Sequence, residues 1–432
     1  MMQSSRQEPY SLKARYVFPV AADPIPDGVV TIRGDRILAV GKQPLGDRPE
    51  DLGNVAVVPG LVNAHTHLEF SDLAGPLGEP GIDFVEWIRL IIENFRHRDG
   101  SSPEALRRGL EESVRVGTTT LGEIAQPGRC LEPFDAVPTD TTVFLELIAP
   151  TADRVAPLLE LAPRHAGSRS PSGRWRPGLS PHAPYSVLPD LLRRAVALSA
   201  ESHVPIAFHL AESRAEIDLI RRGTGPFRDG FEELGTCHPD SFVPGGRPLD
   251  YLRVLSEAHR ALVIHGNYLD DEEIAFLADH ARQMAVVYCP RTHAYFRHDP
   301  YPLEKMLAAG AVVALGTDSR ASSPDLSVLA EMRAVVQKHP SVTHDAVLQL
   351  GTIHGAQALG QASEVGSLEP GKFANLAVVA LPEQDTADPF ELIFNSDRPV
   401  VATWYRGSRV TPSPPARTCR TGKPARPRPR PA

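Results

Sequence analysis

The sequence predicts an α/β protein: a (β/α)8 barrel of the TIM type, with a small β-sandwich built from the N- and C-terminal segments. Short apolar runs alternate with amphipathic stretches over roughly 250 residues, as parallel strands joined by helices would. Segments with strand-like patterning, broken by proline and glycine, flank that region on both sides. The length of 432 residues suits a large barrel with an accessory domain.

The flanking segments are expected to pair with each other. Their strand-like stretches are residues 29–40, 54–60, 366–381 and 399–410. None of them shows a helical stripe of apolar residues. Because chain termini often lie close together, we assign residues 10–58 and 360–410 to one composite β-sandwich and residues 59–359 to the barrel.

Eight apolar runs are candidate barrel strands. They are residues 60–67, 118–125, 142–149, 176–183, 205–212, 261–268, 284–290 and 311–319. Amphipathic stretches predict helices between them, including residues 84–95, 103–117, 189–200, 270–281 and 301–310. Residues 213–250 form a long connection for a barrel, so we expect a lid or a substrate-shaping insertion there.

Composition excludes several classes of protein. A formal net charge of −8 argues against a general nucleic-acid binder. We find no apolar stretch long enough to span a membrane and no secretion signal, so we expect a cytoplasmic protein. Residues 411–432 are rich in proline and arginine and contain no acidic residue, which predicts a disordered basic tail.

The four cysteines are far apart and form no C-x-x-C pair. A disulfide framework or a cysteine zinc site is therefore not expected.

The candidate metal-binding and catalytic residues, histidine and aspartate, lie at the ends of predicted strands. His65 and His67 end the first strand, and alternate residues of a strand point to the same face. His209 ends the fifth strand, His265 the sixth and Asp318 the eighth. Each of these alone is explained by structure, as a satisfied histidine or a helix cap. Together, at the end of the barrel where active sites are built, they predict a metal site.

These stretches resemble the amidohydrolase superfamily, and within it the deaminase and chlorohydrolase branch. The matching stretches are PGLVNAHTHLEFSDL, SPHAPYS, HLAES, VIHGN, LGTDSRASSPDLSVLAEM and VGSLEPGKFANLAVV, so the resemblance covers nearly the whole chain. It implies the same barrel and small β-sandwich.

The resemblance also implies a role for each residue at the strand ends. His65, His67, His209 and Asp318 would bind one divalent metal. His265 would hold the attacking water, Asp318 would accept its proton, and Glu212 would carry protons to the substrate nitrogen.

The possible metal ligands on the predicted strands indicate how many metal ions to expect. Binuclear members of the family often use a carboxylated lysine, and no lysine occurs between Lys42 and Lys305. One ion, Zn²⁺ or Fe²⁺, is therefore expected, with Glu123 or Glu146 left open as a bridging carboxylate. A bound metal would lower the pKa of water from 15.7 to roughly 7, giving a hydroxide that attacks the substrate.

Substrate contacts are expected from four further residues: Glu69, Trp87, His182 and Arg291, with His293 near the last of these. Trp87 resembles a pocket tryptophan of nucleoside deaminases; the alternative is a place in a helix core. Adenosine-type relatives carry a glutamate where this chain has Arg96, which counts against adenosine or adenosylhomocysteine as substrate.

The leading prediction is deamination of an aminopurine nucleoside-like compound, aminodeoxyfutalosine first. A chlorohydrolase or a guanine- or triazine-type aminohydrolase is the alternative, and a scaffold barrel without catalysis is a remote one. The expected partners are a small heterocyclic substrate and water, with no nucleic acid and no membrane. The oligomeric state does not follow from the sequence.

Overall fold

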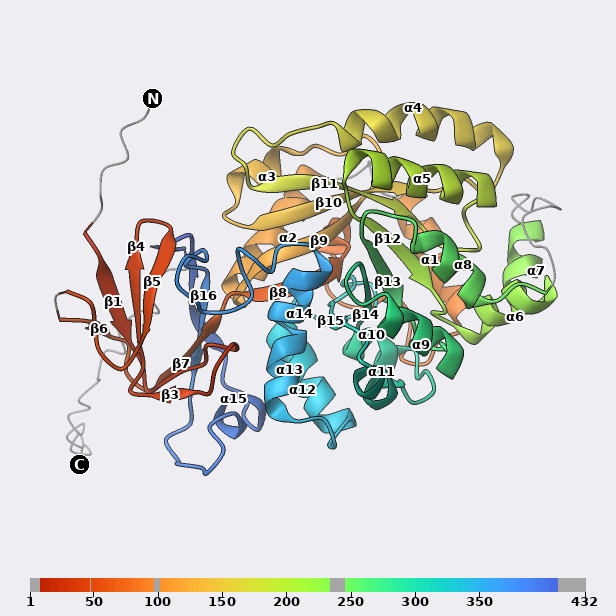
Figure 1. Cartoon of the computed structure of the whole chain (residues 1–432). Helices are drawn as coiled ribbons and strands as arrows, with labels where there is room; N and C mark the ends of the chain where they lie inside the picture. Colours follow the sequence, from red (N-terminus) through yellow and green to blue (C-terminus); the bar gives the residue numbers. More distant parts are fainter. Residues whose placement is uncertain (1–7, 47, 97–101, 234–244, 411–432) are drawn as a thin grey trace, which may run out of the picture.

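The computed structural model describes residues 8–46, 48–96, 102–233 and 245–410. A sheet-rich part formed by both ends of the chain lies beside a larger part in which helices surround strands (Figure 1). The expected tail at 411–432 lies outside the described residues, as do residues 234–244 of the expected insertion.

Eight parallel strands form the barrel, in the order in which they occur along the chain. They are β8 (Leu61–Thr66), β9 (Thr118–Ala125), β10 (Asp140–Leu147), β11 (Trp175–Pro181), β12 (Ile206–Leu210), β13 (Ala261–His265), β14 (Met284–Tyr288) and β15 (Val313–Leu315). Their residues are nearly all buried, as expected of parallel strands covered by helices. Each coincides with one predicted strand, which confirms the expected barrel.

The barrel closes between its first and last strands through individual hydrogen bonds. The Asn63 side chain accepts from the backbone N–H of Thr317 at 3.1 Å and donates to its hydroxyl at 2.8 Å. The N–H groups of Thr317 and Asp318 both donate to the carbonyl oxygen of His65 at 3.1 Å. A Cβ on Gly316 would lie 2.9 Å from the backbone oxygen of His65, so only glycine allows this approach.

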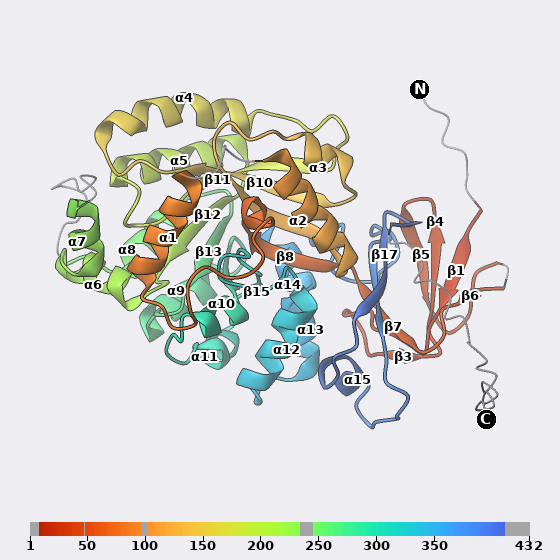
Figure 2. The same cartoon turned by 180° about the vertical axis from the view of Figure 1, so that it is seen from behind.

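Helices surround the barrel strands (Figure 1). They are α1 (Phe84–Arg96), α2 (Pro103–Arg115), α3 (Glu132–Ala136), α4 (Val155–Ala166), α5 (Pro189–Ser202), α6 (Arg214–Arg222), α7 (Pro226–Glu233), α8 (Pro248–Leu255), α9 (Asp271–Asp279), α10 (Pro290–Tyr295), α11 (Leu303–Ala309), α12 (Val328–Lys338), α13 (His344–Leu350) and α14 (Ile353–Ala358). Short 3₁₀ turns are η1 (Leu68–Phe70) and η2 (Ala152–Arg154). The five predicted helices correspond to α1, α2, α5, α9 and α11. The connection at 213–250 carries α6, α7 and α8, and α7 packs against α1 (Figure 2).

Two further sheets lie at the ends of the chain. One has the order β5-β4-β1-β6 and the other β18-β17-β16-β7-β2-β3. The strands are β1 (Tyr10–Lys13), β2 (Tyr16–Val17), β3 (Ile25–Pro26), β4 (Val29–Arg33), β5 (Arg36–Gly41), β6 (Glu50–Asp51), β7 (Val55–Pro59), β16 (Leu376–Ala380), β17 (Val400–Tyr405) and β18 (Ser408–Arg409), and the short helix α15 (Glu391–Phe394) lies before β17.

The two ends of the chain meet in the larger of these sheets. Antiparallel pairing of β16 with β7 aligns Val378 with Val57. Leu12, Ile32 and Trp404 belong to one buried cluster that joins both sheets. The N- and C-terminal segments thus share a core, while the division at residues 10–58 and 360–410 stays a proposal.

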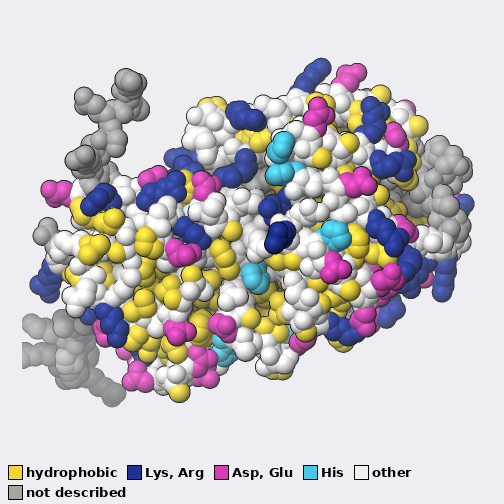
Figure 3. All heavy atoms as spheres, viewed as in Figure 1, with side chains coloured by type: hydrophobic (Ala, Val, Ile, Leu, Met, Phe, Trp, Pro, Cys, Tyr) yellow, Lys and Arg dark blue, Asp and Glu magenta, His cyan; other side chains and the backbone are white. Residues whose placement is uncertain are grey.

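The charges on the surface, the lengths of the helices and the cysteines were compared with the expectations from composition. Basic and acidic side chains are interspersed on the face shown in Figure 3, unlike a basic nucleic-acid face. Among the described helices, none is long and apolar enough to cross a membrane. Cys130 and Cys289 are free, and Cys237 and Cys419 lie outside the described residues.

Candidate active site

The ends of β8, β12, β13 and β15 bring the strand-end residues together. The imidazole centroids of His65 and His67 lie 4.9 Å apart, and His65 lies 4.9 Å from His209 and 5.7 Å from His265. Asp318 Oδ1 lies 3.6 Å from His65 Nε2 and 3.9 Å from His67 Nε2. All five predicted side chains therefore lie at one end of the barrel.

Two of these residues have an uncommon backbone conformation. His265 has φ 69° and Asp318 has φ 55°, in the left-handed region that costs a non-glycine residue roughly 1–2 kcal/mol. Hydrogen bonds hold both turns. The Tyr301 hydroxyl donates to the His265 carbonyl oxygen at 3.0 Å, and the Thr66 hydroxyl donates to the Asp318 carbonyl oxygen at 2.9 Å. Strain of this kind is concentrated at functional sites.

The chemistry of this group fits a cation. Within the described residues, neither ring nitrogen of the fully buried His65 has a hydrogen-bond partner. His65, His67 and Asp318 offer ligand atoms within 4.8 Å of one another, and so do His65, His209 and His265. Such a cluster of buried polar groups is costly unless something pairs with it.

The protonation state of the imidazoles also suits a cation. Burial, followed by neighbouring histidines, holds the pKa of His65 well below its usual value, and burial does the same for His67 and His265. Neutral imidazole is the form that binds metal. His209 donates from Nδ1 to the carbonyl oxygen of His182 at 3.0 Å, which leaves its Nε2 for a ligand.

Glu212 faces the same group from the turn after β12. Its Oε1 lies 3.2 Å from His265 Nε2, and its side chain is buried. Burial first, and then the charges of Asp318 and Glu216, raise the pKa of the Glu212 carboxyl well above its usual value. The raised pKa favours the protonated form of the Glu212 carboxyl, which is the form able to act as an acid.

A cavity of about 400 Å³ opens onto these side chains. Among the residues predicted to contact substrate, Glu69, Trp87 and His182 line it. The Trp87 indole also donates to the Ala321 carbonyl oxygen at 3.1 Å and contacts Phe296, so it belongs both to the cavity wall and to a packed cluster.

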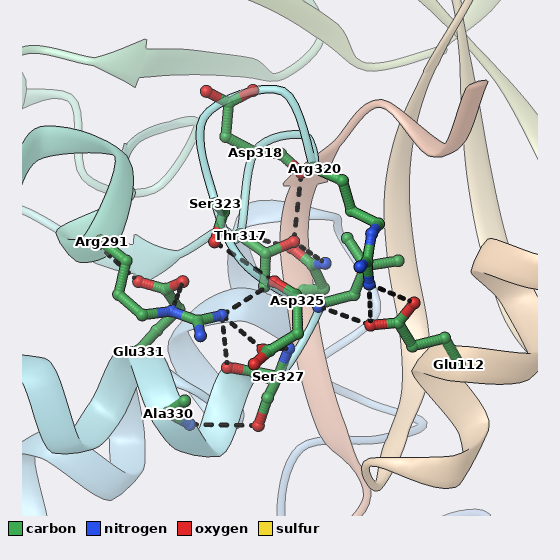
Figure 4. A network of polar contacts seen from close by, with 12 residues as sticks. Glu112, Arg291, Thr317, Asp318, Arg320, Ser323, Asp325, Ser327, Ala330 and Glu331 are labelled. Carbon is green, nitrogen blue, oxygen red and sulfur yellow. Dashed lines mark hydrogen bonds and ion pairs between the residues drawn. The ribbon is translucent and has the colours of Figure 1, made fainter. Parts of the chain in front are cut away.

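Arg291 lies elsewhere, although it was predicted to contact substrate. Its guanidinium donates to Glu331 Oε1 at 2.6 Å and to Asp325 Oδ1 at 2.8 Å, while the Asp318 carboxylate points away from that network (Figure 4). Neither Arg291 nor His293 is among the described residues that line the cavity. Because α10 begins at Pro290, directly after β14, the chain turns Arg291 toward α12 and the strand-end rule does not apply to it.

Two carboxyls considered as bridging ligands are occupied by protein donors. Glu123 accepts from the backbone N–H of Leu68 at 3.0 and 3.2 Å. Glu146 accepts from the amide of Gln126. Burial raises the pKa of Glu146 to about 7. Both carboxyls lie outside the groups able to hold an ion among the described residues.

Several cavity residues were not anticipated. Ile88, Ile91 and Ile92 form an apolar wall on α1, and their spacing with Phe84 was visible as a helical stripe. The exposed Arg154 reaches the rim from η2, in the connection that follows β10. Glu69 forms a buried ion pair with Arg129, for which the sequence carries no local signal.

Comparison with known proteins agrees with this geometry. The model of the Amidohydrolase family matches residues 56–410. The chain belongs to the amidohydrolase family. This confirms the resemblance of the sequence to that family, whose members typically bind a divalent metal.

Individual relatives of this amidohydrolase cover most of its length. It is 31% identical over 375 residues to a 5-methylthioadenosine/S-adenosylhomocysteine deaminase of Halobacterium salinarum, covering 82% of this chain and 80% of the relative. It is 27% identical to an aminodeoxyfutalosine deaminase of Deinococcus radiodurans, covering 78% and 82%. The fold resembles that of Helicobacter pylori aminofutalosine deaminase in complex with methylthio-coformycin, with TM-score 0.81, 21% identity, and coverage of 93% and 100%.

Proposed function

We propose that this amidohydrolase is a metal-dependent deaminase that replaces the amino group of an aminopurine nucleoside-like substrate with oxygen. The observation that carries the proposal is the convergence of four imidazoles, the Asp318 carboxylate and the buried Glu212 carboxyl at the end of the barrel where the cavity opens. The names of the relatives support this substrate class, with aminodeoxyfutalosine as the first candidate.

One divalent ion would be held by His65, His67, His209 and Asp318. Imidazole and carboxylate ligands suit Zn²⁺ and Fe²⁺ alike. When bound, the ion would activate a water molecule and polarise the reacting carbon.

The protein groups move the protons. Asp318 accepts a proton from the attacking water, and its Oδ2 is oriented by the Ser322 hydroxyl at 3.0 Å. His265 orients that water through a hydrogen bond. Glu212 donates its proton to the ring nitrogen as the carbon becomes tetrahedral, which typically accelerates such a step about 10²–10⁴-fold. Asp318 then returns its proton to the amino group, which leaves as ammonia, and the hydroxyl proton passes to Glu212 as the carbonyl forms.

The walls of the cavity orient the substrate. Trp87 and the isoleucines of α1 provide an apolar surface for the heterocycle and its substituent. Glu69 and His182 provide polar contacts on another part of the wall. Only Leu68 separates Glu69 from the proposed ligand His67, which places the Glu69 contact near the reacting end.

The test is ammonia release by the purified chain, loaded with zinc or iron(II), from a panel of aminopurine nucleosides, pterins, triazines and guanidines. Release from an aminopurine nucleoside is expected for the wild type. Asp318→Asn should abolish it while the circular dichroism spectrum is unchanged. Asp271→Asn, an exposed carboxylate on α9, is the matched control and should retain full activity.

Two outcomes would contradict the proposal. One is ammonia release by Asp318→Asn at the wild-type rate. The other is a wild-type chain that carries no stoichiometric metal and hydrolyses none of the panel, which would indicate a scaffold.

A further inference from the structure

The turn that carries Glu212 has a backbone with one left-handed residue. Ala211 has φ 55°. Successive N–H groups around such a residue converge on one point and form a concave site for an anion. In this protein the converging N–H groups are those of Ala211 and Glu212 itself.

The carboxylate of Glu216 occupies that concave site. Its two oxygens accept the N–H of Ala211 at 2.8 Å and the N–H of Glu212 at 2.7 Å. Glu216 is fully buried in the first turn of α6. A glutamate at this helix position usually caps the helix by accepting the N–H of the N-cap residue, here Ser213. Glu216 contacts the backbone of Ser213 and also reaches further back along the chain, to the residue proposed to move the proton.

The other side of Glu212 is also held. The Asn267 amide donates to the Glu212 carbonyl oxygen at 2.8 Å, and Asn267 is buried two residues after His265. The peptide units before and after Glu212 are thus tied to α6 and to the turn after β13. Between these two ties, the Glu212 carboxyl lies 3.2 Å from His265 Nε2.

We infer that Glu216 is a positioning residue for the reaction, which holds the backbone of Glu212 so that its carboxyl meets the substrate nitrogen, with Asn267 as the second tie. This inference rests on the proposed function, because it assumes that Glu212 carries the proton. A displacement of about 1 Å in such a group is enough to lower the rate about 100-fold.

The plainer explanation is that Glu216 only stabilises α6, and the chain contains a control for it. Glu273 is a fully buried glutamate at the same position of α9. It accepts the N–H of Asp270 at 2.8 Å and that of Leu249 at 3.3 Å, neither of which lines the cavity. Loss of either glutamate removes a buried cap, but only loss of Glu216 releases Glu212.

The experiment compares Glu216→Gln with Glu273→Gln in the metal-loaded chain. A glutamine accepts through one oxygen only, so one of the two converging N–H groups loses its partner. We expect kcat of Glu216→Gln to fall between about 10- and 100-fold, with KM and metal content within about twofold of wild type. Glu273→Gln should lose thermal stability to a similar extent and keep its kcat.

A second variant keeps the test decisive if Glu216→Gln does not fold. Asn267→Ala releases the carbonyl side of Glu212, and the same fall in kcat without a change in KM is expected. Folded variants with wild-type kcat would overturn the inference and leave the proposed function intact. A wild-type chain that releases no ammonia would overturn the proposed function and this inference with it.

Discussion

Replacing Arg291 with methionine separates a structural role from a substrate contact. The guanidinium is mostly buried and donates to the carboxylates of Glu331 and Asp325 and to the Asp325 carbonyl oxygen. It lies beneath the segment that follows Asp318, away from the cavity (Figure 4). We therefore expect Arg291→Met to lower stability and to leave KM unchanged.

The magnitude follows from Glu331, whose side chain is fully buried. Breaking a buried ion pair costs about 3–5 kcal/mol, because the remaining charge lacks a partner. Burial already raises the pKa of the Glu331 carboxyl to about 7, although Arg291 opposes that rise. Without the guanidinium this carboxyl takes up a proton near neutral pH, so we expect a loss near the lower end, about 3 kcal/mol.

The assay is chemical denaturation of the metal-loaded variant, together with its kcat and KM. Arg291→Met/Glu331→Gln should recover part of the lost stability, because no charge is then buried alone. A KM raised tenfold or more, with stability within about 0.5 kcal/mol of wild type, would refute the reasoning and make Arg291 a substrate contact.

Three further predictions concern the metal, the rim and pH. Removing the cation with a chelator should lower the melting temperature, because His65 and its neighbours then lose their partner. Adding zinc or iron(II) should restore it. An unchanged melting temperature would contradict a bound ion. Arg154→Met should raise KM about two- to fivefold for an aminopurine nucleoside whose substituent carries a carboxylate, because an exposed cation would attract it, and not for one without a carboxylate. Equal effects on both would argue against such a contact. Burial raises the pKa of the Glu146 carboxyl from 4.5 to about 7. Between these two pH values the folded chain holds a proton on Glu146 that the unfolded chain has lost. The free energy of unfolding should therefore be highest below pH 4.5 and fall as the pH rises toward 7. Denaturation of the metal-free Glu146→Gln variant across this window should show a smaller loss than wild type, and parallel curves would contradict the assignment.

The barrel could be predicted because each of its strands is recognisable from its own sequence. Each is an apolar run, and parallel strands covered by helices must be apolar on both faces. The polar residues that end these runs then share one end of the barrel, which is why His65, His209, His265 and Asp318 could be grouped before the fold was known.

The helices at 213–250 could not be predicted in the same way. Residues 214–222 of α6 carry many charges, and glycine and proline follow at 223–226, a composition typical of a loop. The capping by Ser213 and the burial of Leu219 and Ile220 against the barrel make this segment helical. The Ser213 cap is a local signal, whereas the burial of Leu219 and Ile220 comes from tertiary packing, which overrides local propensity.

The roles of residues that act through a partner far away in the sequence could not be predicted either. Arg291 follows a strand, like the site residues, but forty positions separate it from Glu331, which binds it. The role of Glu216, which lies in the segment expected to be a long connection, could not be predicted, since nothing in the local pattern shows that Ala211 would be left-handed. Strand-end position predicts which end of the barrel a residue occupies, and does not predict where its side chain points.

The proposed ligands His65 and Asp318 stand on opposite sides of the joint where the barrel closes. That joint consists of a few hydrogen bonds between Thr66, Asp318 and their neighbours, across 252 positions of the chain. An ion shared by the two sides would cross-link the start and the end of the barrel. Starving the cell of that ion would then shorten the lifetime of the folded chain against proteases, in addition to stopping turnover.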